Sequence, residues 1–222
     1  MKHGTLNFTL PHIYPITDTG ISGVSHAEQV EKLIAGGALV IQIREKHASS
    51  REFYDSAKRA LEIAHNSGTR IIINDRVDIA LALKADGVHL GQDDMPPEKA
   101  REILGDDAII GFSTHTIEQV IAAIELPIDY IAIGPIFATQ TKENPDRVVG
   151  LDGLREIRRI AANTPLVAIG GINADNLRSV FDAGANSAAI VGAIVSNSLT
   201  ISERMRQLMD ISDHDFNKFK HL

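Results

Sequence analysis

The sequence predicts a single-domain α/β protein, a (β/α)8 TIM barrel, on three observations. Eight short apolar runs recur along the 222 residues, and each leads into a segment with helix signals. Most runs are continuous rather than alternating, as expected of parallel strands covered on both faces. No linker or low-complexity tract interrupts this order, and the length suits one barrel. An open doubly wound sheet is the alternative, but PITDTGISG (15–23) matches its glycine fingerprint poorly.

The predicted strands are HIYPIT (12–17), ALVIQIR (38–44), RIIIN (70–74), GVHL (87–90), AIIGFS (108–113), DYIAIG (129–134), PLVAIG (165–170) and AAIVGA (188–193). A closed barrel requires the eighth strand to pair with the first. The barrel would then cover about residues 12–210 of a single domain, 1–222. We expect the polar tail at 211–222 to fray.

Helix signals occupy the segments between the strands. Three pairs fit capping boxes, in which two side chains satisfy free amides at a helix start: Ser25 with Glu28, Ser49 with Glu52, and Thr116 with Gln119. Pro96 and Pro97 suit a first helical turn. Glycines stand where helices should end, just before the next strand, at Gly36, Gly37, Gly68, Gly105 and Gly184.

Composition excludes several classes of protein. The net charge of −7 argues against general nucleic-acid binding, and the lack of cysteine excludes disulfides, a thiolate nucleophile and Cys-ligated zinc. The first residues lack the apolar core of a signal peptide, and no apolar run is long enough to span a bilayer. We therefore expect a cytoplasmic protein with small-molecule partners and no membrane partner. A homo-oligomer is compatible with the sequence but not required by it.

Polar residues collect where the predicted strands end, which is where barrel enzymes place their active sites. Following the strands from the second to the eighth, they are Gln42, Arg44 and Lys46; Asn74, Asp75 and Arg76; His89, Gln92, Asp93 and Asp94; Ser113 and His115; Thr139, Thr141 and Lys142; Gly170 and Gly171; and Gly192. The opposite ends of the strands show no comparable set of cations and carboxylates. This asymmetry predicts a catalytic mouth.

The segment IQIREK (41–46) explains how cations reach that mouth. Gln42, Arg44 and Lys46 alternate, so they share one face of the strand, while Ile41 and Ile43 occupy the other. An arginine and lysines that converge there would bind a polyanion. Gln42 lies one step deeper, where an amide can read the hydrogen-bonding edge of a heterocycle.

Two further groups of residues indicate metal and phosphate binding. Asp75 and Asp94 end neighbouring strands and could share Mg²⁺, which takes one or two carboxylates and completes its shell with water and phosphate oxygens. Either residue alone would more often be a helix cap or turn residue. The glycines in AIGGIN (168–173) and IVGAI (190–194) suit a phosphate held by backbone amides, with tight packing as the alternative.

The remaining candidates carry less weight. His89 and His115 could be catalytic, although a strand-end histidine bonded to a neighbouring carbonyl is the commoner arrangement. The connection PIFATQTKENPDRVVG (135–150) exceeds the usual βα turn of about two to six residues, which is typical of a lid over an active site. A plain flexible insertion is the alternative.

Six segments together resemble the thiamine-phosphate synthases, also called thiamine-phosphate pyrophosphorylases. They are YPITD (14–18), IQIREK (41–46), IINDRVDIALALKADGVHLGQDDMP (72–96), GFSTHT (111–116), IGPIFATQTK (133–142) and VAIGGIN (167–173). The resemblance runs from about residue 12 to 195 in the family's order. It implies a transferase of thiamine biosynthesis that joins 4-amino-2-methyl-5-(diphosphomethyl)pyrimidine to hydroxyethylthiazole phosphate, giving thiamine phosphate and pyrophosphate.

The resemblance also implies roles for individual residues. The pyrimidine diphosphate would be held by Gln42, Ile43, Arg44, Glu45, Lys46, Asn74, Ser113 and Lys142, of which Arg44, Lys46 and Lys142 would be catalytic. Asp75 and Asp94 would bind Mg²⁺. The thiazole phosphate would contact Thr139, Gln140, Thr141, Gly171, Val191 and Gly192. Where the family often has serine after the valine of the eighth strand, this chain has Gly192, so one hydroxyl contact would be missing.

The family's mechanism is dissociative, with pyrophosphate leaving before the thiazole nitrogen attacks. Two alternatives stay open. A TenI-like thiazole tautomerase shares the barrel but tends to lack the diphosphate apparatus that this sequence carries. A non-catalytic sensor of thiamine precursors would have little need for a metal pair beside a leaving diphosphate.

Overall fold

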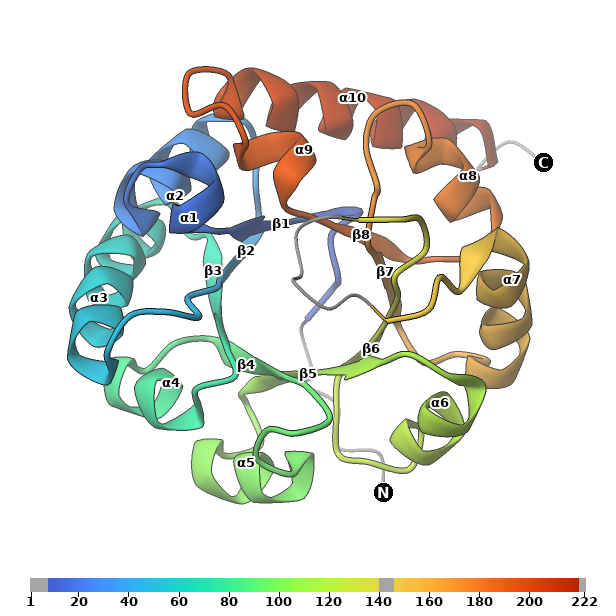
Figure 1. The fold of residues 1–222 in the computed structure, drawn as a ribbon, viewed down its shortest axis with the longest axis horizontal. Coiled ribbons are helices and arrows are strands. Elements are labelled where there is room, and N and C mark those ends of the chain that lie inside the picture. Colours follow the sequence, from blue (N-terminus) through green and yellow to red (C-terminus); the bar gives the residue numbers. More distant parts are fainter. Residues whose placement is uncertain (1–7, 140–145, 220–222) are drawn as a thin grey trace.

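The computed structural model describes residues 8–139 and 146–219, and its side chains as far as residue 213. Eight parallel strands close into one barrel in chain order, and the eighth pairs with the first. Figure 1 shows the strands as a central ring with helices around it. The strands are β1 (Ile13–Thr17), β2 (Val40–Ile43), β3 (Arg70–Asn74), β4 (Gly87–Leu90), β5 (Ile109–Thr114), β6 (Tyr130–Ile133), β7 (Leu166–Ile169) and β8 (Ser187–Ile190). The predicted barrel is confirmed.

The eighth strand ends earlier than predicted. It was expected over 188–193, but β8 ends at Ile190. Val191 leaves the extended region with φ −111° and ψ −87°, and the chain enters a short helix at Gly192. The apolar run therefore continues beyond the strand because it also supplies the buried face of that helix, through Ile194 and Val195.

Helices cover the outside of the barrel. They are α1 (Thr19–Ser22), α2 (His26–Ala35), α3 (Ser50–Ser67), α4 (Val77–Leu83), α5 (Pro97–Leu104), α6 (Ile117–Ala123), α7 (Gly150–Ala161), α8 (Leu177–Asp182), α9 (Gly192–Val195) and α10 (Ile201–Phe219). None of the helices in the described ranges is long and apolar enough to cross a membrane.

The three predicted capping boxes form to different degrees. Ser49 and Glu52 make the complete reciprocal pair at the start of α3. Ser25 and Thr116 each accept the expected backbone N–H. Their partners act elsewhere, because Glu28 accepts a hydrogen bond from Lys32 and Gln119 accepts one from the amide that precedes the cap.

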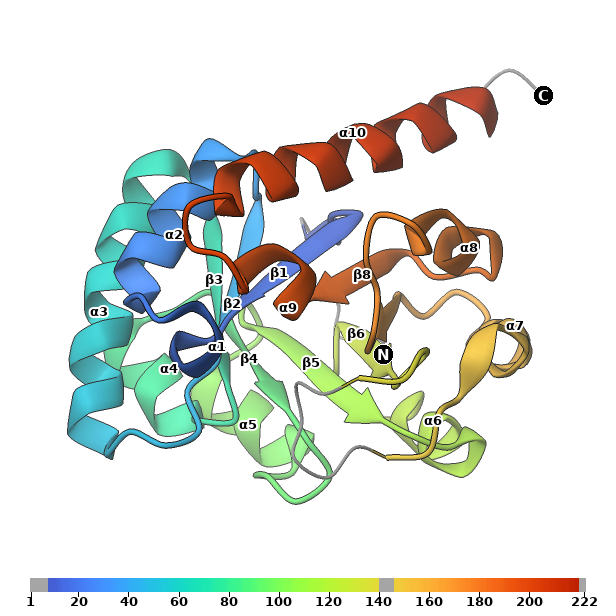
Figure 2. The same cartoon turned by 45° about the horizontal axis from the view of Figure 1, so that its top comes forward.

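Helix α10 contradicts the prediction of a frayed tail over residues 211–219, while residues 220–222 lie outside the described part of the chain. The chain stays helical to Phe219, and Figure 2 shows α10 as one long helix beside α2 and α8. Ile201, Met205 and Leu208 are fully or almost fully buried, and Ile211 packs against the same core. Their spacing is helical, so the apolar stripe that seats α10 extends past the boundary that polar composition indicated.

The strands have two different apolar faces. Ile41 and Ile43 belong to the core between the barrel and its helices, where each buried side chain contributes about 1.5–3 kcal/mol. The inward face forms a second cluster, made of Tyr14, Ile16, Val40, Ile72, Ile109, Tyr130, Ala132, Val167 and Ala189. Gln42 lies between Ile16 and Ile72 in the register of this inner face. Its position confirms the predicted alternation for Ile41, Gln42 and Ile43. The strand was expected to extend to residue 44 but ends at Ile43, so Arg44 and Lys46 reach the cavity from the connection that follows it.

The amino-terminal ends of the strands carry charges that the sequence analysis missed. Arg101 pairs with Asp129 at 2.8 Å, and the two side chains are only 7% and 4% exposed. The same Asp129 carboxylate accepts the amide of Ile110 at 2.7 Å, and Arg101 also donates to the carbonyl of Pro127. This pair closes the gap between β5 and β6 at the end of the barrel opposite the predicted mouth, the end that in this fold serves stability rather than chemistry.

Candidate active site

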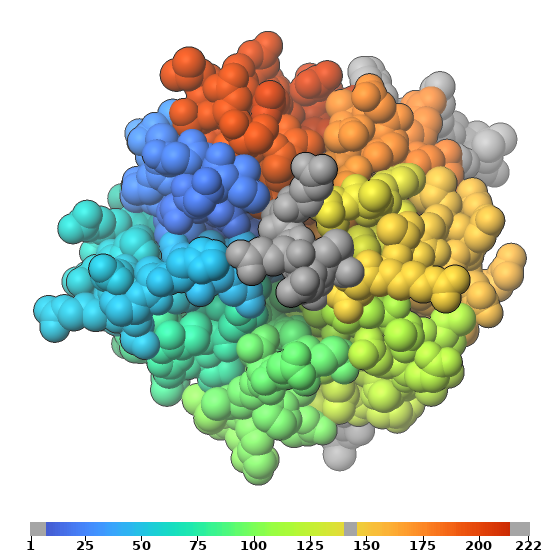
Figure 3. Space-filling model, viewed as in Figure 1, coloured from blue at the N-terminus to red at the C-terminus, as the bar shows by residue number. Residues whose placement is uncertain are grey.

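A cavity of ≈ 680 Å³ opens at the carboxyl ends of the strands. This volume lies within the range of small-molecule sites. Of the predicted site residues, its lining includes Gln42, Arg44, Lys46, Asn74, Asp75, Asp94, Ser113, Thr139, Gly171, Val191 and Gly192. Figure 3 shows the same face in space-filling form, with segments from all parts of the chain around its rim. Residues distant in sequence are thus brought to one mouth.

Two of the predicted site residues turn away from the cavity, and three cannot be placed. Ile43 is fully buried on the outer face of β2. The Glu45 carboxylate accepts hydrogen bonds from Thr19 at 3.0 Å and from the amide of His47 at 2.9 Å. Contact between either of these side chains and a ligand in the cavity is therefore not supported. Gln140, Thr141 and Lys142 lie outside the described residues.

The cations at the mouth are paired with carboxylates of the same chain. Arg44 donates to Asp18, whose other carboxylate oxygen caps α1 by accepting from Ile21 at 3.0 Å. Lys46 donates to Asp75. Arg44 is 22% exposed, so its charge is compensated by Asp18 yet remains accessible from the cavity.

Asp75 and Asp94 come together as the sequence predicted. Asp75 has φ 62°, a left-handed conformation that is uncommon outside glycine and that tends to occur at functional sites. Asp94 accepts the amide of Gly91 at 2.7 Å. Burial raises the pKa of the Asp94 carboxyl above its usual value; the Gly91 hydrogen bond opposes this shift, and the charge of Asp75 adds to it.

This carboxylate pair fits Mg²⁺ better than a metal that needs a full protein shell. Within the described ranges, no cluster of three or more His, Cys, Asp or Glu side chains is arranged to hold a metal. A metal ion bound by only these two carboxylates would keep several coordination positions for water and for ligand oxygens. Mg²⁺ prefers this combination of ligands. A divalent cation would also relieve the repulsion that raises the Asp94 pKa.

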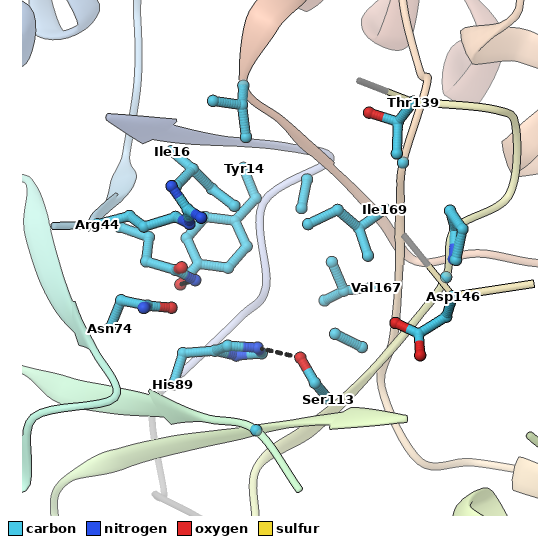
Figure 4. A pocket seen from close by; sticks show the side chains of 18 of the residues that line it. Tyr14, Ile16, Arg44, Asn74, His89, Ser113, Thr139, Asp146, Val167 and Ile169 are labelled. Atoms are coloured by element: carbon cyan, nitrogen blue, oxygen red, sulfur yellow. Dashed lines mark hydrogen bonds between the residues drawn. The ribbon is translucent and has the colours of Figure 1, made fainter. Parts of the chain in front are cut away.

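A chain of hydrogen bonds forms the floor of the cavity. Gln42 Nε2 donates to Tyr14 Oη at 3.2 Å, and the Tyr14 and Tyr130 hydroxyls lie 3.0 Å apart. Tyr130 Oη lies 3.0 Å from His89 Nδ1, and His89 Nε2 lies 2.8 Å from Ser113 Oγ. Figure 4 shows the last of these bonds, with Arg44 and Asn74 on the same side of the cavity and Thr139 and Asp146 across it.

The groups in this floor are neutral at ordinary pH. Burial lowers the pKa of His89 to about 4 and raises the pKa of both Tyr14 and Tyr130. The expectation of a strand-end histidine bonded to a carbonyl is wrong for His89. It is confirmed for His115, whose Nδ1 donates to the carbonyl of Gly134 at 2.7 Å.

The sequence analysis missed the two tyrosines, although a signal was present. Gly111 is the register partner of Tyr130 on the neighbouring strand. A Cβ on Gly111 would lie 2.1 Å from Tyr130 Cζ, so only glycine leaves room for this ring. A glycine inside a strand often marks such a close approach.

The glycines after β7 have both a packing role and a place in the cavity wall. Gly170 and Gly171 have φ 99° and 65°. A Cβ on Gly171 would lie 2.6 Å from the carbonyl oxygen of Ala138, so the segment after β6 packs directly on this backbone. Both glycines also line the cavity, next to Val191 and Gly192.

A family model described as thiamine monophosphate synthase matches residues 13–194. The chain belongs to this family. The matched span includes all eight strands and ends inside α9, before α10. The resemblance drawn from the six sequence motifs is therefore confirmed.

Individual members of the thiamine monophosphate synthase family are similar over nearly their whole lengths. A thiamine-phosphate synthase of Chloroflexus aurantiacus is 44% identical over 203 residues, which cover 90% of this chain and 93% of that protein. One of Clostridium novyi is 46% identical, covering 83% and 91%. The solved thiamine phosphate pyrophosphorylase of Pyrococcus furiosus superposes with a TM-score of 0.83 at 36% identity, covering 91% of this chain and 96% of that one.

Proposed function

We propose that this chain is a thiamine-phosphate synthase. It would join 4-amino-2-methyl-5-(diphosphomethyl)pyrimidine to hydroxyethylthiazole phosphate and release pyrophosphate. The observation that carries the proposal is a single cavity with two different walls. One wall has cations and a carboxylate pair, and the other has glycine-rich backbone. Relatives named thiamine-phosphate synthase at 44% and 46% identity support the same activity.

The wall formed by β2 to β5 suits the pyrimidine diphosphate. Arg44 and Lys46 line the cavity, and each is paired with one carboxylate, Asp18 or Asp75. Diphosphate oxygens can replace these carboxylates as hydrogen-bond acceptors. Asn74 Nδ2 is buried and has no hydrogen-bond partner among the described residues. An unpaired buried donor is costly, and a ligand oxygen would satisfy it.

The opposite wall suits the thiazole phosphate. Gly171, Val191 and Gly192 line the cavity at the ends of β7 and β8, where barrels commonly hold phosphate with backbone amides. Thr139 lies on the same side and adds a hydroxyl. Contacts from Gln140 and Thr141 follow from the family resemblance alone, since they lie outside the described residues.

The proposed reaction breaks the bond between the pyrimidine methylene carbon and the diphosphate oxygen, whose electron pair leaves with pyrophosphate. The thiazole nitrogen then forms a bond to the methylene carbon with its own lone pair, so no strong general base is required. Arg44 and Lys46, with Lys142 by resemblance, stabilise the negative charge that grows on the leaving group. Mg²⁺ held by Asp75 and Asp94 would add charge neutralisation at the diphosphate oxygens. Holding both substrates in one cavity lowers the entropic part of the barrier.

The composition of the cavity favours a synthase over a tautomerase. Arg44, Lys46, Asn74, Asp75, Gln92 and Asp94 all line it, and a thiazole isomerisation has no use for a diphosphate site. Omitting each substrate in turn tests this choice. We expect thiamine phosphate only when both substrates are present. Isomerisation of a thiazole phosphate tautomer without the pyrimidine would favour the tautomerase instead.

Gln42→Ala is expected to raise the KM for the pyrimidine diphosphate about tenfold and to leave the KM for the thiazole phosphate nearly unchanged. The reason is that Gln42 lies at the base of the wall assigned to the pyrimidine. Steady-state kinetics with each substrate varied in turn measures both constants. Gln207→Ala, at an exposed position on α10, is the matched control and should alter neither. An effect confined to thiazole phosphate would mean that the two walls are assigned the wrong way round.

A further inference from the structure

The hydrogen bonds in the cavity floor form one unbranched series from Gln42 to Ser113. Tyr14 and Tyr130 are each 1% exposed, and His89 is 8% exposed, so these side chains are largely shielded from solvent and their described partners lie within the series. Each tyrosine hydroxyl has two hydrogen-bond partners in the series. The imidazole of His89 also has two, one at each ring nitrogen. A series of this kind has a direction, because each hydroxyl and the neutral imidazole can donate one hydrogen only.

The Gln42 amide sets the direction. Its Nε2 can only donate, so Tyr14 Oη accepts there. Either tyrosine hydroxyl can donate to the other, but the order in which every buried hydroxyl hydrogen has an acceptor is the one in which Tyr14 donates to Tyr130 Oη. Tyr130 then donates to His89 Nδ1, which leaves the imidazole hydrogen on Nε2. His89 Nε2–H donates to Ser113 Oγ. The hydroxyl hydrogen of Ser113 is the one that no member of the series uses.

The surrounding packing holds these groups in place. The Tyr14 and Tyr130 rings meet edge to face with centroids 5.9 Å apart, and His89 stacks on Tyr130 at 5.6 Å with an interplanar angle of 18°. The backbone of Ser113 is fixed as well, because its carbonyl accepts from Gln92 Nε2 at 2.6 Å. Reorienting one member would therefore require several buried rings to move together.

We propose that Tyr14, Tyr130 and His89 are positioning residues that turn the hydroxyl hydrogen of Ser113 into the cavity. Ser113 is then presented as a hydrogen-bond donor to an acceptor atom of the pyrimidine diphosphate, and not as an acceptor. This inference rests on the proposed function for the identity of the ligand. It deepens that function by assigning roles to Tyr14, which lines the cavity, and to Tyr130, for neither of which the family resemblance implies a role.

The tautomer of His89 tests the direction without any substrate. Long-range ¹H–¹⁵N spectra of the imidazole nitrogens distinguish a hydrogen on Nε2 from one on Nδ1, and the His89→Gln variant identifies the signal. We expect the Nε2–H tautomer in the free protein. In Tyr130→Phe, Nδ1 has lost its donor, and we expect both tautomers to be populated. A wild-type protein with the hydrogen on Nδ1 would reverse the direction and overturn the proposal, whatever reaction the protein catalyses.

Kinetics test whether the tyrosines act through Ser113. Tyr130→Phe and Ser113→Ala should each lower kcat/KM for the pyrimidine diphosphate about tenfold to a hundredfold, the range for one lost hydrogen bond to a charged ligand. If Tyr130 acts only by orienting Ser113, the double variant should be no worse than Ser113→Ala alone. Multiplying effects would contradict the proposal.

Two further variants separate positioning from folding. Tyr14→Phe interrupts the same series from its other side and should reproduce the kinetic loss of Tyr130→Phe, including its dependence on Ser113. Tyr54→Phe removes a hydroxyl from α3, outside the series, and should leave kcat/KM unchanged. A folded Tyr14→Phe protein with wild-type kinetics and an unaltered His89 tautomer would overturn the proposal.

Discussion

Asp94→Ala is expected to lower turnover by about two to three orders of magnitude while the barrel stays folded. Removal of a single group that stabilises charge in a transition state has about this effect. Asp94 is one of the two carboxylates at the mouth that suit Mg²⁺, and two-carboxylate sites have no spare protein ligand. Turnover measured over a range of Mg²⁺ concentrations, together with circular dichroism, tests both parts of the expectation.

The charge of Asp94 is not expected to support folding. Its pKa is raised in the folded state, so ionisation of this carboxyl costs folding free energy at any pH above its unfolded pKa. Loss of activity in Asp94→Ala would thus report on the site and not on stability. Asp107→Ala, at an exposed position that does not line the cavity, is the control and should retain turnover. Near-normal activity of Asp94→Ala in Mg²⁺ would count against the metal assignment.

Arg101→Ala is expected to lower the free energy of unfolding by about 3–5 kcal/mol, the usual result of removing one partner of a buried ion pair. Asp129 would keep its charge at 4% exposure without the guanidinium. The carbonyls of Gly105, Ala108 and Pro127 would also lose a donor. Urea unfolding followed by fluorescence or circular dichroism measures the loss.

Arg51→Ala is the control for this second prediction. Arg51 is 92% exposed and reaches Asp55 only at 4.0 Å, so its removal should change stability by less than about 0.5 kcal/mol. Because the Arg101–Asp129 pair lies at the end of the barrel opposite the cavity, the kcat of folded Arg101→Ala should match wild type. A destabilisation below about 1 kcal/mol would show that the pair contributes little to the fold.

The strands and the mouth could be predicted because their signals are local. Continuous apolar runs mark strands buried on both faces, and parallel strands in a barrel bring their carboxyl ends to one side. Gln42, Arg44 and Lys46 all line the cavity as predicted, although only Gln42 does so from within the strand, because β2 ends at Ile43. The pairing of Asp75 with Asp94 followed from the same reasoning.

The interactions that the sequence analysis missed join residues distant in the chain. Tyr14 and Tyr130 are 116 positions apart and meet only because the barrel closes. Arg101 and Asp129 belong to different strand–helix units, and neither residue sits in a recognisable motif. The tail was misjudged for another reason, since Ile211 continues a helical stripe within a segment whose composition is polar.

The measurement that tests the central claim most directly is a coupling assay with both substrates. Pyrophosphate and thiamine phosphate are followed together in Mg²⁺, with a parallel reaction in EDTA. The proposed function predicts equal yields of the two products and loss of both in EDTA. Failure to form thiamine phosphate, by a folded protein that still binds the thiazole phosphate, would contradict it.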